Sequence, residues 1–459
     1  MRFVLLPLLA MLAAGACAYH DEGKRPEAEM PSSLEAATPS ASVWPDPEWW
    51  RRFGSAELDS LIVEARMRNQ ELAAAMARVR QAQALARVAQ APLLPALGLD
   101  ASATGQGVND QTGASSGLYP TASLAARYEI DFWGRNSAAA AAARSLAGAS
   151  RYDQETVALT VVTEVANRYF QVRAARARLG IARQNLATSR SVLEQVAARA
   201  RAGTALPREL AQQRALVAMQ EAAIPPLERS EVEALAALAV LLGRPAQGFA
   251  VRQSGLDAIV PAPVEPGLPS ELLVRRPDIA AAEAELAAAR ADVAAARAAM
   301  FPRISLTGTA GVQSAALSTV TGGTSFLYSL VAGLTQPIFD NGALAGQLEQ
   351  AKARQEELVA NYRAAMIDAF SDVQKALQAT ASLARQQAMQ EVVVAESREA
   401  FALASAQYRA GAEDMLTVLD TQRVLYAALD QLEQVKLARL QALVGLYKAL
   451  GGGWQAGGA

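Results

Sequence analysis

Residues 121–132 have the sequence Thr-Ala-Ser-Leu-Ala-Ala-Arg-Tyr-Glu-Ile-Asp-Phe. Every second side chain of this stretch is apolar, and most of the side chains between them are polar. Because successive side chains of a strand point to opposite faces, the alternation predicts a strand with one apolar and one polar face. The two faces of such a sheet meet two different solvents.

Three further segments of the chain carry strand signals. Residues 97–104 alternate in the same way, and residues 304–310 repeat the pattern. In residues 326–338 the apolar side chains fall on both faces, so the sequence does not fix the register of this fourth strand. We therefore expect two strands within residues 97–133 and two within residues 304–339.

The second half of the chain is a copy of the first. Leu94-Pro95-Ala96-Leu97-Gly98-Leu99 recurs as Phe301-Pro302-Arg303-Ile304-Ser305-Leu306, and Arg201-Ala202-Gly203 recurs as Arg409-Ala410-Gly411. A repeat of this length is a duplicated half-protein rather than a solenoid unit. Each repeat has the order helix, two strands, long helix, tight turn, helix. We expect the first repeat at residues 43–242, a proline-rich connector at 243–269, the second repeat at 270–450 and a tail at 451–459.

A very long helix follows the strands in each repeat. Residues 137–202 contain no proline, and apolar side chains recur along them every seven positions, namely Val165, Val172, Leu179, Leu186, Leu193 and Ala200. This heptad pattern predicts a helix packed along a continuous seam. At about 1.5 Å per residue, roughly 65 residues extend about 100 Å, too long for one compact domain. The matching helix begins near Leu344, and Gly203 and Gly411 mark the two turns, since glycine tolerates the left-handed conformation at a helix end.

The composition excludes several classes of function. Among 459 residues, 43 Lys and Arg stand against 45 Asp and Glu, and the net charge of −2 argues against nucleic-acid binding. One Cys and one His cannot complete a zinc site, a catalytic triad would need the single His20 as its base, and the sequence contains no phosphate-binding loop motif. We therefore expect neither an enzyme nor a metal or cofactor site. With 5% aromatic residues, we also do not expect an aromatic-rich core.

The first residues carry a secretion signal. Residues 1–16 combine Arg2, an apolar run and small residues directly before Cys17, the pattern of a bacterial lipoprotein signal whose cysteine is acylated. Acylation would also remove the only thiol of a secreted chain. We expect a signal peptide at 1–16 and a lipidated Cys17 followed by a polar linker, together spanning 17–42. The alternative is an ordinary signal peptide cut near Ala18.

Four strands are too few to form a pore within one chain. Strands of about ten residues match the length needed to cross an outer membrane, but an open sheet in lipid would leave unpaired backbone groups that cost several kcal/mol each. The chain must therefore share a barrel with copies of itself, although this argument does not fix their number. The alternative is a soluble periplasmic coiled coil with a small hairpin domain, which leaves the two different strand faces unexplained.

Several recognisable motifs lie between residues 43 and 454. They are Leu268-Pro269-Ser270-Glu271-Leu272-Leu273-Val274-Arg275-Arg276-Pro277-Asp278-Ile279, Ala282-Glu283, Phe301-Pro302, Gln336-Pro337-Ile338-Phe339-Asp340 and Leu446-Tyr447-Lys448-Ala449-Leu450-Gly451-Gly452-Gly453-Trp454. Together they resemble the outer-membrane efflux protein (TolC-like) family, and most of all its NodT-like lipoprotein branch. The resemblance implies a mixed α and transmembrane β fold: a homotrimer whose 12-stranded β-barrel, with four strands per protomer, is continuous with a long α-helical barrel.

The resemblance also implies a function and a set of partners. The protein would be a lipid-anchored, integral outer-membrane channel that extends into the periplasm. It would be a passive exit duct for small toxic compounds, pumped by an inner-membrane RND-type transporter through a periplasmic adaptor protein. Two alternatives are the outer channel of a protein-secretion system and a periplasmic scaffold or adaptor anchored by Cys17. The sequence does not indicate which substrates are transported.

Four residues are candidates for gating the channel or for docking its adaptor. Leu416 and Asp420 are four positions apart and therefore share one helix face. In related channels an apolar residue and an aspartate at these motif positions form the periplasmic gate, and the resemblance assigns the same role here; the alternative for Asp420 is an ordinary solvated carboxylate. The turns at Gly203 and Gly411 would be the tips where the adaptor docks. We expect Arg276-Pro277-Asp278 to be structural, with Pro277 as the first residue of a helix.

Overall fold

The structure, a computed structural model, describes residues 45–110, 113–252, 255–259, 275–313 and 325–455. The expected signal peptide, Cys17 and its linker lie outside the described residues, as do residues 253–254 and 260–269 of the connector. The described residues form two compact units. The first contains Ala77–Arg151 and Ala281–Ala364, and the second contains residues 45–76 together with the remainder of the chain between and after these two segments.

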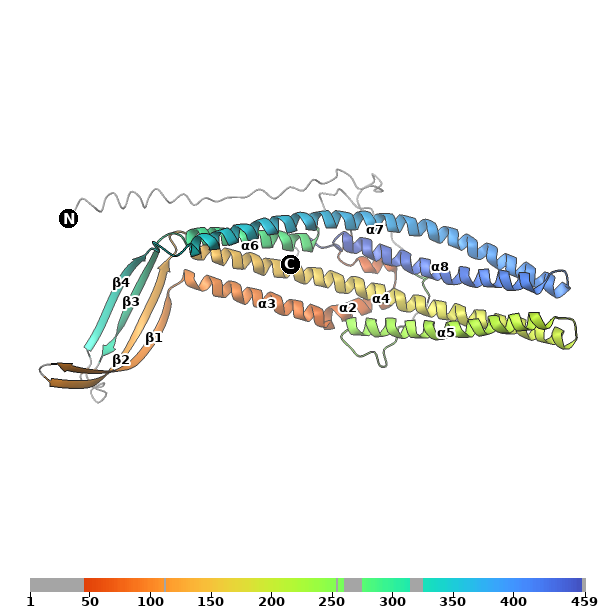
Figure 1. Cartoon of the computed structure of the whole chain (residues 1–459), viewed down its shortest axis with the longest axis horizontal. Coiled ribbons are helices and arrows are strands. Elements are labelled where there is room, and N and C mark those ends of the chain that lie inside the picture. The colour runs from red at the N-terminus through yellow and green to blue at the C-terminus, as the bar shows by residue number, and fades with distance from the viewer. Residues whose placement is uncertain (1–44, 111–112, 253–254, 260–274, 314–324, 456–459) are drawn as a thin grey trace. The chain divides into compact units, whose positions relative to one another are not determined.

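The elements follow each other twice in the same order (Figure 1). In the first repeat they are α2 (Ala56–Arg68), α3 (Gln70–Gln90), β1 (Ala96–Asp110), β2 (Gly113–Ile130), α4 (Arg135–Arg201) and α5 (Pro207–Leu241). In the second they are α6 (Pro277–Ala298), β3 (Arg303–Gln313), β4 (Ser325–Thr335), α7 (Ala343–Ala410) and α8 (Met415–Ala449). The predicted duplication is therefore confirmed, with one difference: the first helix of the first repeat is divided at Asn69, whose side chain accepts from the N–H of Leu72 and donates to the carbonyl of Leu241.

The four strands form one antiparallel sheet in the order β1-β2-β3-β4. The predicted polar face of the sheet carries its own hydrogen bonds. Ser102 and Thr121 join β1 to β2 through their hydroxyl groups at 2.7 Å, and Thr309 and Ser329 join β3 to β4 at the same distance. Cross-strand polar pairs of this kind stabilise a sheet by roughly 0.2–1 kcal/mol each.

The register of β4, which the sequence left open, follows from its pairing with β3. Leu306 pairs with Ala332, and Ile304 pairs with Leu334. One face of β4 therefore continues the apolar face of β3, with Phe326, Tyr328, Leu330, Ala332 and Leu334. The strand ends at Thr335 rather than near Ile338, two residues before Pro337, which has no N–H to donate to a ladder.

The first two strands are longer than the ten residues we expected. β1 has 15 residues and β2 has 18. They pair with each other as far as Asp110 and Gly113, whereas β2 pairs with β3 only between Thr121 and Ile130. The additional residues form a two-stranded hairpin beyond the four-stranded part of the sheet (Figure 1).

The two long helices are close to their predicted bounds. α4 has 67 residues and α7 has 68. Within the heptad seam of α4, Val165, Val172, Leu179 and Leu186 are buried, whereas Leu193 and Ala200 are partly buried. In α7, Val373 and Val394 are buried and Phe401 packs against a buried cluster.

Six aromatic side chains meet in one buried cluster of the second unit, where our expectation for this composition was a core poor in aromatic residues. Trp49 and Phe53, from the 3₁₀ helix η1 (Trp49–Phe53), pack against α4 and α8. Trp49 stacks on Tyr447 with ring centroids 4.7 Å apart, and Phe53 meets Phe170 edge to face. A low overall aromatic content therefore does not prevent a local aromatic core, because these rings come from segments far apart in the sequence.

Candidate functional site

The turns after α4 and α7 have the same backbone geometry. Gly203 has φ 75° and Gly411 has φ 78°, in the left-handed region. In both turns the residue after the glycine returns a backbone hydrogen bond into the helix, from Thr204 to the carbonyl of Arg199 and from Ala412 to that of Gln407, each 2.9 Å. Each bond satisfies a carbonyl at the helix end that would otherwise lack a partner. The predicted turns are therefore confirmed as structural features.

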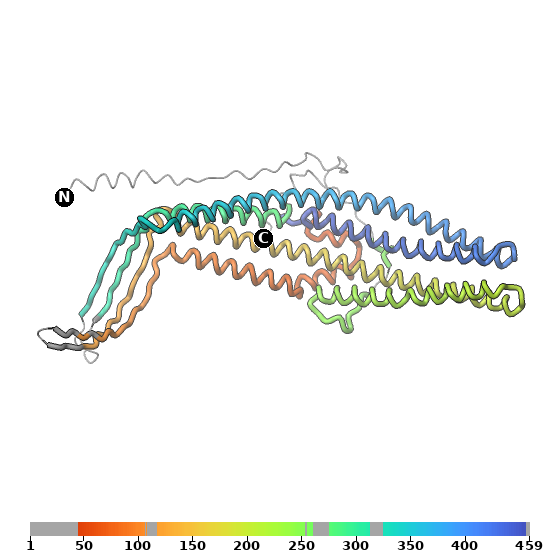
Figure 2. The backbone as a smooth tube through the Cα atoms, viewed as in Figure 1, coloured from red at the N-terminus to blue at the C-terminus, as the bar shows by residue number. Residues whose placement is uncertain are grey.

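Both turns lie together in the second unit (Figure 2). The ends of the two helical hairpins share a buried apolar cluster made of Val196, Leu216, Ala404, Tyr408, Met415, Val418 and Leu419. Across the hairpins, Arg199 donates from Nη1 to the carbonyl of Tyr408 at 3.1 Å, and its guanidinium lies 4.5 Å from the centre of the Tyr408 ring. The cation over the aromatic face adds roughly 0.5–1 kcal/mol at a partly exposed site.

Leu416 and Asp420 lie on the exposed side of the first turns of α8. The helix begins with Asp414 as its cap, whose Oδ1 accepts from the N–H of Thr417 at 2.9 Å. This hydrogen bond holds the pKa of Asp414 below its ordinary value. Met415 and Val418 point into the cluster between the hairpins, which leaves Leu416 54% exposed.

Asp420 has a partner that the sequence analysis did not assign to the site. Arg423 forms an ion pair with it at 3.2 Å, and both side chains are more than half exposed. Their spacing of three residues on a helix is the signal that could have found the pair. An exposed ion pair of this kind contributes about 0–1 kcal/mol to stability. The Asp420 carboxylate therefore has a positive charge beside it but stays free to move away from it.

A buried polar layer crosses the bundle of α4, α5 and α8 behind this surface. Gln213 and Gln422, which match each other in the two repeats, are fully buried. Gln213 donates to the carbonyl of Ser189 at 2.8 Å, while Gln422 donates to the hydroxyl groups of Ser189 and Tyr426. A polar layer inside an otherwise apolar seam favours one register of the helices, because a shift would break the hydrogen bonds that the two amide groups donate. Sequence periodicity did not reveal this layer.

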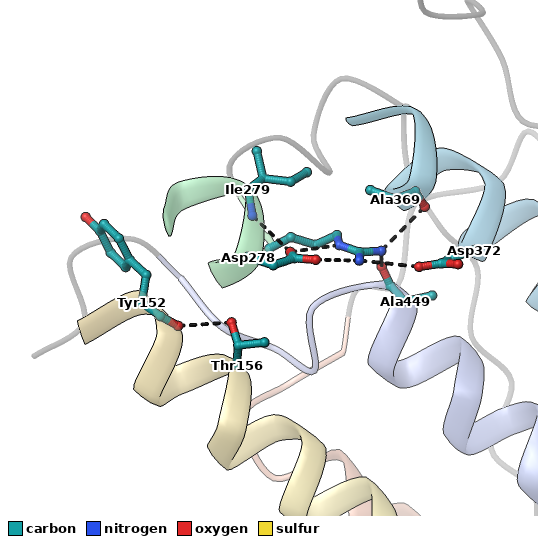
Figure 3. A network of polar contacts seen from close by, with 8 residues as sticks. Tyr152, Thr156, Asp278, Ile279, Ala369, Asp372 and Ala449 are labelled. Carbon is teal, nitrogen blue, oxygen red and sulfur yellow. Dashed lines mark hydrogen bonds and ion pairs between the residues drawn. The ribbon is translucent and has the colours of Figure 1, made fainter. Parts of the chain in front are cut away.

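The Arg276-Pro277-Asp278 motif forms a second polar centre, also in the second unit (Figure 3). Pro277 begins α6, as predicted. Arg276, whose side chain is 11% exposed, donates twice to the carboxylate of Asp278, at 3.0 and 2.7 Å. It also donates to the carbonyl of Ala449 at 3.2 Å and lies 3.4 Å from the carboxylate of Asp372. The motif therefore joins the start of α6 to α7 and to the end of α8.

Arg276 and Asp278 each stabilise the charged form of the other. Burial disfavours both charged forms, but the hydrogen bonds and charges of the pair outweigh it. The net effect raises the pKa of Arg276 and lowers the pKa of Asp278. The arrangement is a structural clamp, in agreement with the interpretation of the motif from the sequence.

The glycine run that follows α8 passes close to three other segments. A Cβ atom on Gly451 would overlap the carbonyl of Arg275, and one on Gly453 would overlap the backbone of Asp46. Trp454 then packs edge to face on Tyr152, with centroids 5.7 Å apart. These contacts explain the Gly-Gly-Gly-Trp sequence by close backbone approach.

The described residues contain no candidate metal site and no candidate membrane-spanning helix. Among them, no group of three or more His, Cys, Asp or Glu side chains could hold a metal ion. None of the helices among the described residues is long and apolar enough to span a membrane. What these residues do provide is a sheet with one apolar and one polar face, long paired helices, and a pair of exposed turns.

These features are those of a channel-forming protein of the outer membrane. The model of the outer membrane efflux protein family matches residues 61–244 and 268–452, and the chain belongs to this family. The chain is 47% identical to the pyoverdine export outer membrane protein OpmQ of Pseudomonas putida, covering 98% of this chain and 97% of OpmQ. It is 34% identical to the outer membrane protein OprJ of Pseudomonas aeruginosa, covering 99% and 97% of the two chains. Its structure is similar to the open-state MtrE outer membrane channel of Neisseria gonorrhoeae, with a TM-score of 0.85, 30% identity and coverage of 94% and 97%.

The protein is thus a non-enzymatic outer-membrane channel of a tripartite efflux pump that extends into the periplasm. The predicted fold class is confirmed, because its four strands and long helices match the trimeric channels of the family. Channels of this family form trimers and work with efflux pump partners. Relatives named for pyoverdine export and for solvent efflux favour this function over the two alternatives, a protein-secretion channel and a lipid-anchored scaffold.

Proposed function

We propose that this chain is the exit duct of a pump whose inner-membrane component is an RND-type transporter, and that a periplasmic adaptor binds the turns at Gly203 and Gly411. The observation that carries the proposal is the openness of the two turns. A Cβ atom on either glycine would meet no atom of the chain within 4 Å, although the helices beside the turns are tightly packed. The packed helices hold the backbone of the turns in place, and the outer side of the turns is uncovered. Such a surface is suited to bind a partner protein.

Leu416 and Asp420 form the periplasmic gate in this proposal. They are exposed on α8 within the first two turns after Gly411, and in a trimer three copies would surround one axis at the same level. Three carboxylates around an axis repel each other and attract cations. Arg423 beside each Asp420 reduces this repulsion, which favours a closed state.

The proposed cargo is a small secreted compound of the kind that the relatives export. OpmQ of P. putida is named for the export of pyoverdine, and the identity of 47% extends over nearly the whole of both chains. We therefore place pyoverdine first among the candidate substrates, and small toxic compounds second. The duct itself selects little, because a wide water-filled channel has few contacts with its cargo, and the transporter makes the selection.

The test is a deletion strain of the source bacterium, complemented with the intact gene. We expect the deletion to lower secreted pyoverdine, or to lower the inhibitory concentration of compounds in a toxic panel, and complementation to restore both. A strain that secretes and survives normally in every assay would contradict the proposal. Purification of a tagged channel after cross-linking in cells should recover an adaptor and an RND-type transporter; recovery of an ATP-driven pump instead would contradict the partner assignment.

A further inference from the structure

The outer strands of the sheet each have one backbone edge without a partner in the part of the chain that the structure describes. β1 pairs with β2, and β4 pairs with β3. Lipid offers no hydrogen bonds to such edges, and channels of this family form trimers, so β4 of one copy must meet β1 of the next. The internal repeat specifies which residues meet there.

The pairings within the two hairpins show which residues are equivalent. Leu97 pairs with Ala126 in the first hairpin, and its repeat counterpart Ile304 pairs with Leu334 in the second. Leu334 is therefore equivalent to Ala126. In the same way Leu99 pairs with Leu124 and Leu306 pairs with Ala332, so Ala332 is equivalent to Leu124.

The seam between the repeats provides the template. There β2 pairs with β3, with Ala126 opposite Gly308 and Leu124 opposite Ala310. Counting from the pair Leu97 and Ile304, Gly308 corresponds to Ala101 and Ala310 corresponds to Ala103. β4 is the repeat equivalent of β2, and β1 is the repeat equivalent of β3. The seam between two copies, where β4 of one meets β1 of the next, therefore joins the same kinds of strand as the β2–β3 seam.

We propose that the seam between protomers repeats the register of the seam between repeats. Leu334 then lies opposite Ala101 of the partner subunit, and Ala332 lies opposite Ala103 of the partner subunit. The same register places Thr335 opposite Asp100 of the partner subunit and Gly333 opposite Ser102 of the partner subunit.

The alternation of side chains supports this register independently. Leu334 and Ala332 are on the apolar face of the second hairpin, and Ala101 and Ala103 are on the apolar face of the first. A shift by one residue would place Leu334 opposite Asp100 and would turn the apolar face of one copy toward the polar face of the next. The proposed register keeps apolar residues with apolar ones across the seam.

Two exposed apolar side chains gain a partner in this arrangement. Ile338 is 98% exposed and Leu97 is 71% exposed in the single chain. At the seam between the repeats, their equivalents Ile130 and Ile304 lie opposite each other and are partly buried. The same counting places Ile338, three residues beyond the end of β4, opposite Leu97 of the partner subunit, where each is partly covered as Ile130 and Ile304 are.

The register of the β2–β3 seam can be repeated between protomers only as far as Ala103 of β1. The next position, Thr104, corresponds to Gly311, where a Cβ atom would overlap the carbonyl of Ala122 and the Cβ of Ser123. The backbones approach too closely there for a threonine. Beyond Ala103 the strands of neighbouring copies must therefore separate or follow a wider path than β2 and β3 do.

Paired cysteines in the full-length channel test the register. The chain has one native cysteine, Cys17, so single-cysteine variants measure its background. The on-register pairs are Leu334→Cys with Ala101→Cys and Ala332→Cys with Ala103→Cys. The off-register pairs, shifted by two residues on the same face, are Leu334→Cys with Leu99→Cys, Leu334→Cys with Ala103→Cys, and Ala332→Cys with Ala101→Cys. Outer membranes are treated with a short thiol cross-linker, and covalent multimers are separated after full denaturation.

We expect both on-register pairs to give covalent trimers that a reductant reverses, at least fivefold above the off-register pairs and the single variants. The trimer is verified for every variant by its migration without heating. Cross-linking of an off-register pair in preference to the on-register pairs would overturn the proposal, as would an intact trimer in which neither on-register pair reacts. The two on-register pairs use different residues, so a folding defect in one leaves the other informative. Neither outcome depends on the pump or the cargo.

Discussion

Arg276 connects three segments of the chain through one guanidinium group. It holds the carboxylate of Asp278 with two hydrogen bonds, donates to the carbonyl of Ala449 and lies near Asp372 on α7. Nearby, Gly451 passes so close to Arg275 that no side chain fits. The conspicuous motifs of this sequence are therefore explained by packing inside one protomer, and a recognisable motif need not be a functional site.

We predict that Arg276→Ala lowers the free energy of unfolding by about 2 kcal/mol, because it leaves Asp278 and the carbonyl of Ala449 without their donor. Thermal unfolding of the purified channel, followed by circular dichroism, measures the change. Arg354→Ala is the matched control, since Arg354 pairs with Glu357 on the surface and its loss should have almost no effect. Equal effects of the two substitutions would contradict the clamp.

The clamp also has a predicted pH dependence. The pKa of Asp278 is lowered in the folded chain, because the bonds and charge of Arg276 outweigh its burial. The carboxylate therefore contributes its full stabilisation above its unfolded pKa of about 3.9, and this contribution is lost as the pH falls through the lower folded value. Acid unfolding between about pH 4 and pH 2 should weaken the wild type more than Arg276→Ala. Parallel pH curves for the two proteins would exclude this assignment.

The gate assignment also concerns single residues. We predict that Leu416→Ala combined with Asp420→Ala raises single-channel conductance in a planar bilayer, because both the apolar constriction and the charge ring are removed. Leu206→Ala is the matched control: Leu206 has the same 54% exposure as Leu416 and precedes α5 in the first repeat. Unchanged conductance in the double variant would remove these two residues from the gate.

Among the elements, the two turns are alike in backbone and in openness. Each glycine has a positive φ, and a Cβ atom added to either would have open space around it. A substitution there changes the surface and strains the turn, but it does not disturb the packing of the helices below.

We predict that Gly203→Leu with Gly411→Leu abolishes compound resistance while the amount of trimer in the outer membrane is unchanged. Each left-handed leucine costs about 1–2 kcal/mol, which the packed helices can tolerate. Gly248→Leu is the matched control, because Gly248 has the same φ of 75° and equally open surroundings away from the turns. Full resistance in the double variant would show that the adaptor binds elsewhere.

Strands and helices differ in how far the sequence could predict them. The bounds of α4 and the starts of α6 and α7 were predicted within two residues, since proline and glycine are local signals, such as Pro277 at the start of α6 and Gly203 after α4. The strand faces of β1, β2 and β3 were predicted from alternation. The register of β4 was not, because Leu327 and Val331 place apolar side chains on its second face as well, and only the partner strand decides between the faces.

For the whole molecule, trimer formation and membrane attachment are separate questions. The unpaired edges of the sheet require an oligomer, which is a trimer in channels of this family. Cys17, outside the described residues, is proposed to carry acyl chains. We predict that metabolic labelling with a fatty acid marks the wild type and leaves Cys17→Ser unlabelled, with mass spectrometry placing the modification at residue 17. Each acyl chain would strengthen membrane attachment by about 0.8 kcal/mol per buried CH₂ group. Label retained in Cys17→Ser would refute lipidation at this residue.

The sequence by itself determined the duplicated order of elements, the amphipathic strands, the long helices and the need for an oligomer. These follow from side-chain periodicity and from the backbone's demand for hydrogen bonds, both of which are fixed along the chain. Only the tertiary structure decided the register of β4, the buried layer around Gln213 and Gln422, and the meeting of Arg276 with Ala449. Most of these depend on contacts between residues far apart in sequence, and such contacts form only when the packed elements bring their side chains within a few ångströms of each other.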